Sequence, residues 1–112
     1  MDYKIIEYCS PKGLEFEFVG LEDWADFEIL VEILEKHLEC MVIEKYDGPY
    51  SRFCKFEKDG VEFRLMQHPE LGNALLAMIQ NNNNNQSIRK WANDVLNAYN
   101  TVAPYIYSRK LS

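Results

Sequence analysis

The residues of this sequence best suited to chemistry lie in one short predicted loop. His68 and Glu70 flank Pro69 there, so an imidazole and a carboxylate could act as base and acid. Cys54 is a possible nucleophile, but its place in an alternating strand puts it on the predicted core face. No Gly-rich phosphate loop, G-x-S-x-G elbow or H-E-x-x-H motif accompanies them. The sequence therefore favours a protein that is not an enzyme, with a small hydrolase or transferase using His68 and Glu70 as the alternative.

A metal site has little support in the spacing of histidines and cysteines. His37 and Cys40 are three residues apart on a predicted helix, but two ligands do not close a site and no second pair follows. The spacing favours a surface histidine beside a buried thiol, and we expect neither a metal nor a cofactor. Cys9, Cys40 and Cys54 include no close pair, so we expect free thiols.

A row of glutamates is the strongest candidate for a binding feature. Its members recur at steps of three or four residues: Glu28, Glu32, Glu35 and Glu39. On a helix they fall within roughly 60° and extend for about 16 Å, which suits either a solvated face or attraction of a basic partner. Ile29 and Ile33 lie where a solvent-facing helix should be polar, so either the final helix or a partner covers them. We take these two isoleucines and the four glutamates as candidate partner-binding residues.

The helix that must position these glutamates is predicted over Asp23–Met41. Its apolar residues recur in the pattern of one buried face: Trp24, Phe27, Val31, Leu34, Leu38 and Met41. Asp23 is the expected N-cap, and Asp26 adds negative charge near the positive end of the helix dipole. We expect Trp24, like Trp91 further along the chain, to lie in the core.

Alternating runs before and after this helix predict five strands, over residues 3–8, 14–19, 41–46, 52–58 and 61–67. Ser10-Pro11-Lys12-Gly13 and Asp47-Gly48-Pro49 are turn signals, and Asp59-Gly60 predicts a tight hairpin. A two-residue turn at Asp59-Gly60 pairs Phe56 with Phe63 and Cys54 with Leu65 on one face.

The last third of the chain is harder to assign. Ala74–Ile79 can be a short helix or a buried strand, and we favour a strand because it would extend the sheet. Residues 81–86 read as a polar, Asn-rich loop. Ser87 is the expected cap of a second helix that ends just before Pro104.

These elements predict one α+β domain over residues 1–112. We expect a single antiparallel sheet of about five to six strands with two helices packed on one face, in the order ββα-βββ(β)-α. Glu15 and Glu17 then lie on the open face of the sheet.

Charge is unevenly divided along the chain. Residues 1–47 hold 13 acids and 4 bases (13 − 4, net −9), and residues 48–112 hold 5 acids and 8 bases (8 − 5, net +3). This balance argues against direct nucleic-acid binding, which needs clustered Lys and Arg, but it allows a basic protein partner. The first residues carry no export signal and the longest apolar run, Ala74–Ile79, is too short for a membrane span, so we expect a cytoplasmic protein.

Several segments resemble one known class of protein. The pattern around Trp24-Ala25-Asp26-Phe27, Val42–Arg52, Asp59–Phe63 and Leu71-Gly72-Asn73 is similar to small bacterial immunity proteins of contact-dependent inhibition and polymorphic toxin systems. The resemblance covers about residues 20–80. It implies a single α/β domain that binds and neutralises a cognate toxin domain, often a nuclease, in the cytoplasm of the producing cell. A cytoplasmic adaptor is a further alternative.

Overall fold

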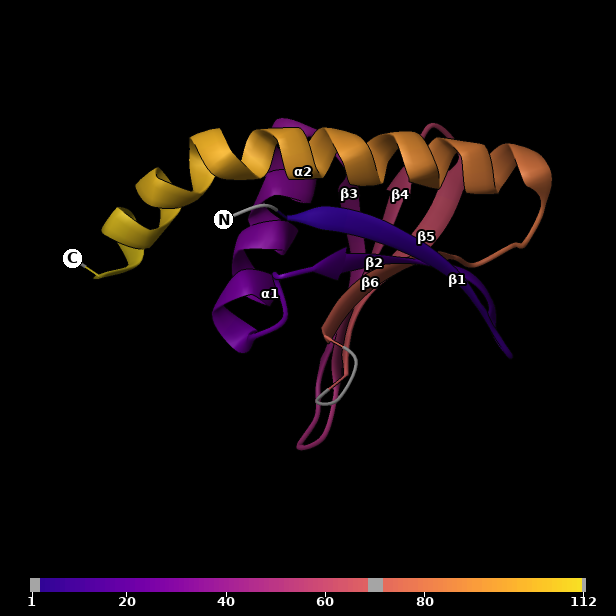
Figure 1. The fold of residues 1–112 in the computed structure, drawn as a ribbon, viewed down its shortest axis with the longest axis horizontal. Helices are drawn as coiled ribbons and strands as arrows, with labels where there is room; N and C mark the ends of the chain where they lie inside the picture. The colour runs from indigo at the N-terminus through magenta and orange to yellow at the C-terminus, as the bar shows by residue number, and fades with distance from the viewer. Residues whose placement is uncertain (1–2, 69–71, 112) are drawn as a thin grey trace.

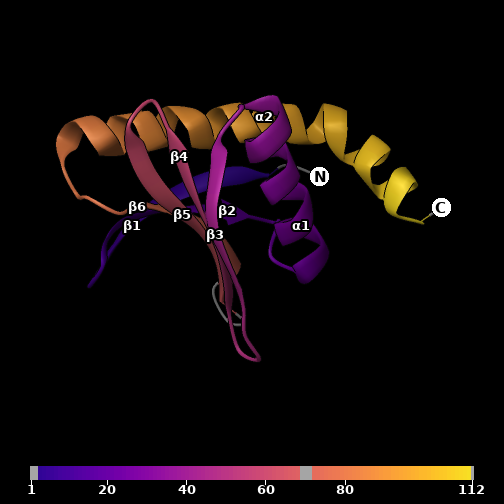
Figure 2. The same cartoon turned by 180° about the vertical axis from the view of Figure 1, so that it is seen from behind.

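A six-stranded antiparallel sheet carries two helices in the computed structural model, which describes residues 3–68 and 72–111 (Figures 1 and 2). The strands are β1 (Lys4–Ser10), β2 (Gly13–Val19), β3 (Met41–Asp47), β4 (Arg52–Lys58), β5 (Val61–His68) and β6 (Gly72–Ala77). The helices are α1 (Trp24–Glu32), continued by a short π-helix, η1 (Ile33–His37), and α2 (Asn82–Leu111). Spatial order is β1-β2-β6-β5-β4-β3. The predicted α+β class and element order are confirmed.

Local pairing follows the sequence closely. β4 and β5 pair Phe56 with Phe63 and Cys54 with Leu65, as predicted. Asp59 and Gly60 between them have φ of 50° and 80°, the positive values that a type I′ turn requires. The ambiguous run in the last third is a strand, although it begins at Gly72 and ends at Ala77.

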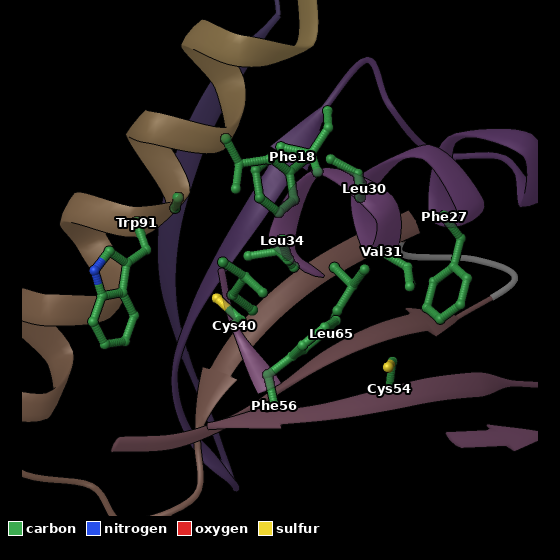
Figure 3. Packing of buried hydrophobic residues seen from close by; sticks show 14 of the residues in the cluster. Phe18, Phe27, Leu30, Val31, Leu34, Cys40, Cys54, Phe56, Leu65 and Trp91 are labelled. Atoms are coloured by element: carbon green, nitrogen blue, oxygen red, sulfur yellow. The ribbon is translucent and has the colours of Figure 1, made fainter. Parts of the chain in front are cut away.

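The core fills the face of the sheet that α1, η1 and α2 cover. Four phenylalanines are fully buried on it: Phe16, Phe18, Phe56 and Phe63. Trp91 of α2 approaches this layer from one side and Phe27 of α1 lies at its other end, with Leu34 and Leu65 between them (Figure 3). Trp91 is 6% exposed, so its predicted core position is confirmed.

The first helix departs from the prediction in its second half. α1 begins with the predicted N-cap at Asp23, which forms a capping box with Asp26, but ends at Glu32, where the wider turn of η1 follows. Glu39 then takes φ of 58° and leads into β3, so Met41 belongs to a strand and is 58% exposed. The prediction of one buried helical face from Trp24 to Met41 is therefore wrong at both ends, because Trp24 is also 47% exposed.

The second helix is longer than predicted at both ends. The Asn-rich loop and the Ser87 cap are wrong, because Asn81 caps the helix through a 2.8 Å bond from the Asn84 amide to its Oδ1. The Asn84 side chain also donates to the Ile79 carbonyl. The helix passes through Pro104. Proline has no backbone N–H, so the Asn100 carbonyl has no helical donor at this position. Both residues are exposed, and water can donate to this carbonyl instead.

A row of buried polar side chains fixes the entry into α1. Strand pairing aligns Arg52, Gln67 and Asn73 on the covered face, one on each of β4, β5 and β6. Asn73 donates to the Leu21 carbonyl at 2.8 Å, and Gln67 donates to the Glu22 carbonyl at 3.2 Å. Because these bonds are directional, they hold the start of α1 at one place on the sheet.

Candidate partner-binding surface

The predicted row of glutamates is divided by contacts within the protein. Glu28 accepts a 2.8 Å bond from the Arg52 guanidinium. Glu32 is partly buried and pairs with both Lys36 and Arg109. Glu35 and Glu39 are exposed, but Glu39 lies beyond η1. The four carboxylates therefore do not form one continuous stripe, and the charge of Glu32 is paired with cations of the same molecule.

Ile29 and Ile33 have no exposed surface. Both belong to the core, and α2 contacts both α1 and η1. Of the two alternatives for covering Ile29 and Ile33, the final helix or a partner, the structure has the final helix on this side of α1. Their assignment as partner-binding residues is wrong, because a fully buried side chain has no surface to offer a second protein.

The edge strand β3 exposes the apolar residues that the core does not use. Exposed fractions are 58% for Met41, 42% for Ile43 and 50% for Tyr46. A bulge between Val42 and Glu44 shifts the pairing with β4, so apolar side chains appear on both faces of the strand. The sequence held a signal for this, because its apolar residues do not keep to alternate positions as in a half-buried strand.

Trp24 lies against a charged cluster at the start of α1. The Arg52 guanidinium carbon is 4.1 Å from the centroid of the Trp24 ring and 4.8 Å from that of Phe27. Arg52 also pairs with Glu28 and, at 3.3 Å, with Asp47. The ring is half exposed while the arginine beneath it is almost buried, so the exposed tryptophan is held in a fixed orientation.

Electrostatic effects on Cys54 connect this cluster to β3. Burial raises the pKa of the Cys54 thiol to about 11, Lys45 lowers it, and the charges of Glu35 and Glu28 raise it further. Glu28 of α1 and Asp47 of β3 both pair with Arg52, and Lys45 lies opposite Cys54 in the pairing of β3 with β4, so the acidic side of α1 faces the end of β3. We call the exposed residues of α1, η1 and β3 along this edge, on both sides of the strand, the α1–β3 surface; its members are Trp24, Glu28, Glu35, Glu39, Met41, Ile43, Glu44, Tyr46 and Asp47.

The predicted catalytic pair lies only partly within the described residues. His68 ends β5 and is exposed, whereas Pro69 and Glu70 lie outside the described residues. Burial raises the pKa of the Cys40 thiol to about 11, and Cys9, Cys40 and Cys54 are all free. Among residues 3–68 and 72–111, no three His, Cys, Asp or Glu side chains are grouped as a metal site would require.

Two further findings bear on the class of protein. Neither α1 nor α2, in the part of the chain that is described, combines the length and the apolar character that crossing a bilayer requires. Comparisons of the chain with protein-family models, with curated proteins and with solved structures found no match.

Proposed function

We propose that this protein is an immunity-type binding protein that neutralises a basic toxin domain by contact through the α1–β3 surface. The observation that supports this most is that large apolar residues are exposed on both sides of the β3 edge. Trp24 lies over Arg52 on the helix side, Met41 and Tyr46 lie on the open side, and exposed carboxylates accompany them. A large apolar residue exposed singly is ordinary, but a group of them with an acidic border is typical of an interaction site.

The composition of the surface suits a binding centre. Tryptophan, tyrosine and arginine are the residues most enriched among those that dominate binding energy. Arg52 holds the Trp24 ring in place before a partner arrives, so less conformational entropy is lost on binding. As an edge strand, β3 also presents backbone groups that have no sheet neighbour.

The charge of the surface suits a basic partner. It is built from the segment 1–47, which has 13 acids and 4 bases. Glu35, Glu39 and Glu44 are exposed around the apolar residues, so they can steer a cationic surface toward them. A bound protein of ordinary size would cover this edge and hold the toxin's own basic surface away from its substrate.

Co-expression tests the proposal directly. The product of the reading frame immediately upstream would be expressed as the toxin, with this chain or a Trp24→Ala/Tyr46→Ala variant. We expect the variant to protect cells less and to bind at least about thirtyfold more weakly, the loss typical of removing central anchors. Ile6→Ala is the matched control, because Ile6 is 42% exposed on β1, at the opposite edge of the sheet from β3. Full protection by the double variant at wild-type expression would refute the α1–β3 surface.

Salt dependence tests the electrostatic part separately. Raising ionic strength from about 50 to 500 mM shortens the Debye length from roughly 14 to 4 Å, so association should slow. Glu35→Gln/Glu39→Gln should reduce that dependence, whereas Glu15→Gln/Glu17→Gln on the open face should not. If the two double variants respond equally to salt, the carboxylates of α1 and η1 do not guide the partner.

A further inference from the structure

The open face of the sheet, opposite the helices, carries a cavity of about 530 Å³. The tips of the β1–β2 and β3–β4 hairpins project on the side away from α2 (Figures 1 and 2). Strand pairing places Glu17, Ala74, Met66 and Phe53 side by side across β2, β6, β5 and β4, and all four line the cavity. This volume is in the range of about 300 to 1,000 Å³ typical of small-molecule sites.

Two carboxylates, Glu15 and Glu17, lie at the β2 end of the cavity, where Lys12 of the β1–β2 turn also lines it. Glu15 is only 7% exposed although it lies on the open face, and Glu17 follows two residues later on the same side of β2. The ion pairs of the described residues include neither carboxylate. Glu15 interacts with the hydroxyl of Tyr8, which is a neutral partner.

Burial without an ion pair is unfavourable for Glu15, and the half-buried Glu17 lies beside it. Lys12 lines the same cavity but forms no ion pair with either carboxylate in the described residues. Burial raises the pKa of Glu17, and the charges of Glu22 and Glu15 raise it further. A cation supplied from outside would offset both the loss of water and the repulsion between Glu15 and Glu17. The acidic end is therefore suited to an ammonium group with several hydrogen-bond donors.

The rest of the cavity limits what the cation can carry. Ala74 and Met66 form an apolar floor beside Glu17, and Phe53 continues it. The Arg64 guanidinium carbon lies 4.3 Å from the centroid of the Phe53 ring, so a positive charge already occupies the far end. A second cationic group there would be repelled, which favours a ligand with one charge and an apolar body.

We propose that this cavity binds a small organic monocation, with its ammonium group at Glu15 and Glu17 and its apolar stem along Ala74 and Met66 toward Phe53. The site lies on the face of the sheet opposite α1. Tyr46 of the α1–β3 surface stacks on Phe53 at 5.4 Å, so the cavity is tested on the chain with Tyr46 intact, where either proposal can fail alone.

The test is an NMR titration of the full chain with phenethylamine, with phenethyl alcohol as its uncharged analogue. We expect the amine to shift the amides of Glu17, Met66 and Ala74 in a saturable manner, with a Kd on the order of 1 mM or below. The alcohol should bind about tenfold more weakly or not at all, because it lacks the charge-assisted bonds. Hexylamine should also bind, and diaminohexane should bind less tightly because of Arg64.

Variants locate the effect. Glu15→Gln/Glu17→Gln should weaken phenethylamine binding about tenfold or more. Glu57→Gln is the matched control, because Glu57 lies on the same face but does not line the cavity. Any of three results would overturn the proposal. The wild type could bind the amine and the alcohol equally, the double variant could bind phenethylamine as tightly as the wild type, or neither amine could give a saturable response. The comparison of phenethylamine with phenethyl alcohol uses the wild-type chain, so it tests the proposal even if the double variant does not fold.

Discussion

The hydroxyl of Tyr99 donates a 2.7 Å hydrogen bond to Oδ1 of Asp26, the residue that completes the capping box of α1. Both side chains are buried, with 5% and 8% of their surfaces exposed. Burial raises the pKa of Asp26, while the bonds from Tyr99 and from the Asp23 amide act in the opposite direction. One carboxylate thus ties α2 to the first turn of α1, which carries part of the proposed binding surface.

Removing the donor should destabilise the fold. Tyr99→Phe keeps the ring, which packs at 5.3 Å against Tyr3, but leaves Asp26 buried with one bond fewer. We expect the free energy of unfolding at neutral pH to fall by about 1 to 3 kcal/mol, the usual penalty for a buried group that loses its partner. Urea denaturation measures it, with Tyr105→Phe as an exposed control. A loss no larger than the control's would show that this bond does not contribute.

The pH dependence of stability should carry a signature of Asp26. Because its pKa is raised in the folded state, the folded protein holds this proton more tightly than the unfolded chain. Its contribution to stability is therefore fully present below the ordinary value of 3.8 and is lost as the pH rises through the folded pKa. Asp26→Asn should remove that loss, so the variant and wild type should diverge as the pH increases above about 4. Parallel unfolding curves for the two proteins at every pH would contradict the assignment.

Asn73 should be among the least replaceable residues. It is fully buried and its amide donates to two backbone carbonyls before α1, those of Leu21 and Asp23. Asn73→Asp keeps the shape but replaces the donor with an acceptor, so we expect a loss of about 2 to 4 kcal/mol in the free energy of unfolding. Asn93→Asp on the exposed side of α2 serves as the comparison. Similar melting temperatures for both variants would mean that the polar row does not hold α1.

The two tryptophans should differ in their effect on stability. Trp91→Ala should cost about 3 to 5 kcal/mol, because its ring is buried against Phe63. Trp24→Ala should cost only about 1 kcal/mol, the value of an exposed cation–π contact with Arg52. Denaturant unfolding of both variants provides the measurement. A Trp24→Ala variant as unstable as Trp91→Ala would place Trp24 in the structural core and remove it as a binding anchor.

Local signals in the sequence predicted much of the fold. The Asp59-Gly60 turn alone determines the pairing of Phe56 with Phe63, because a two-residue hairpin leaves no freedom of register. The N-cap at Asp23 is equally predictable, because a short carboxylate directly before an amphipathic run is typical of a helix N-terminus. In both cases the residues that decide the structure are neighbours in the chain.

Where distant contacts decide, the sequence was misleading. The asparagines at 82–85 have low helix propensity, but they lie in α2 behind the cap at Asn81. The periodicity through Met41 does not indicate the wider turn at Ile33, so it predicts a buried Met41 where the structure has an exposed residue of β3. Trp24 keeps the helical period, but it lies over the Arg52 side chain of β4 and is half exposed. The open-face cavity depends on β6 lying between β2 and β5, which no local pattern encodes.

The central position of β6 has a consequence for synthesis of the chain. β1 and β2 form one hairpin and β3, β4 and β5 form a separate meander, and among the described strands β6 is the one that pairs with both groups. During translation, neither group can complete the sheet until residues 72–77 have left the ribosomal tunnel. Until then α1 can contact β4 and β5 through Arg52 and Gln67, but the two groups of strands are not paired, and a ribosome stalled before Gly72 would hold the sheet in two parts.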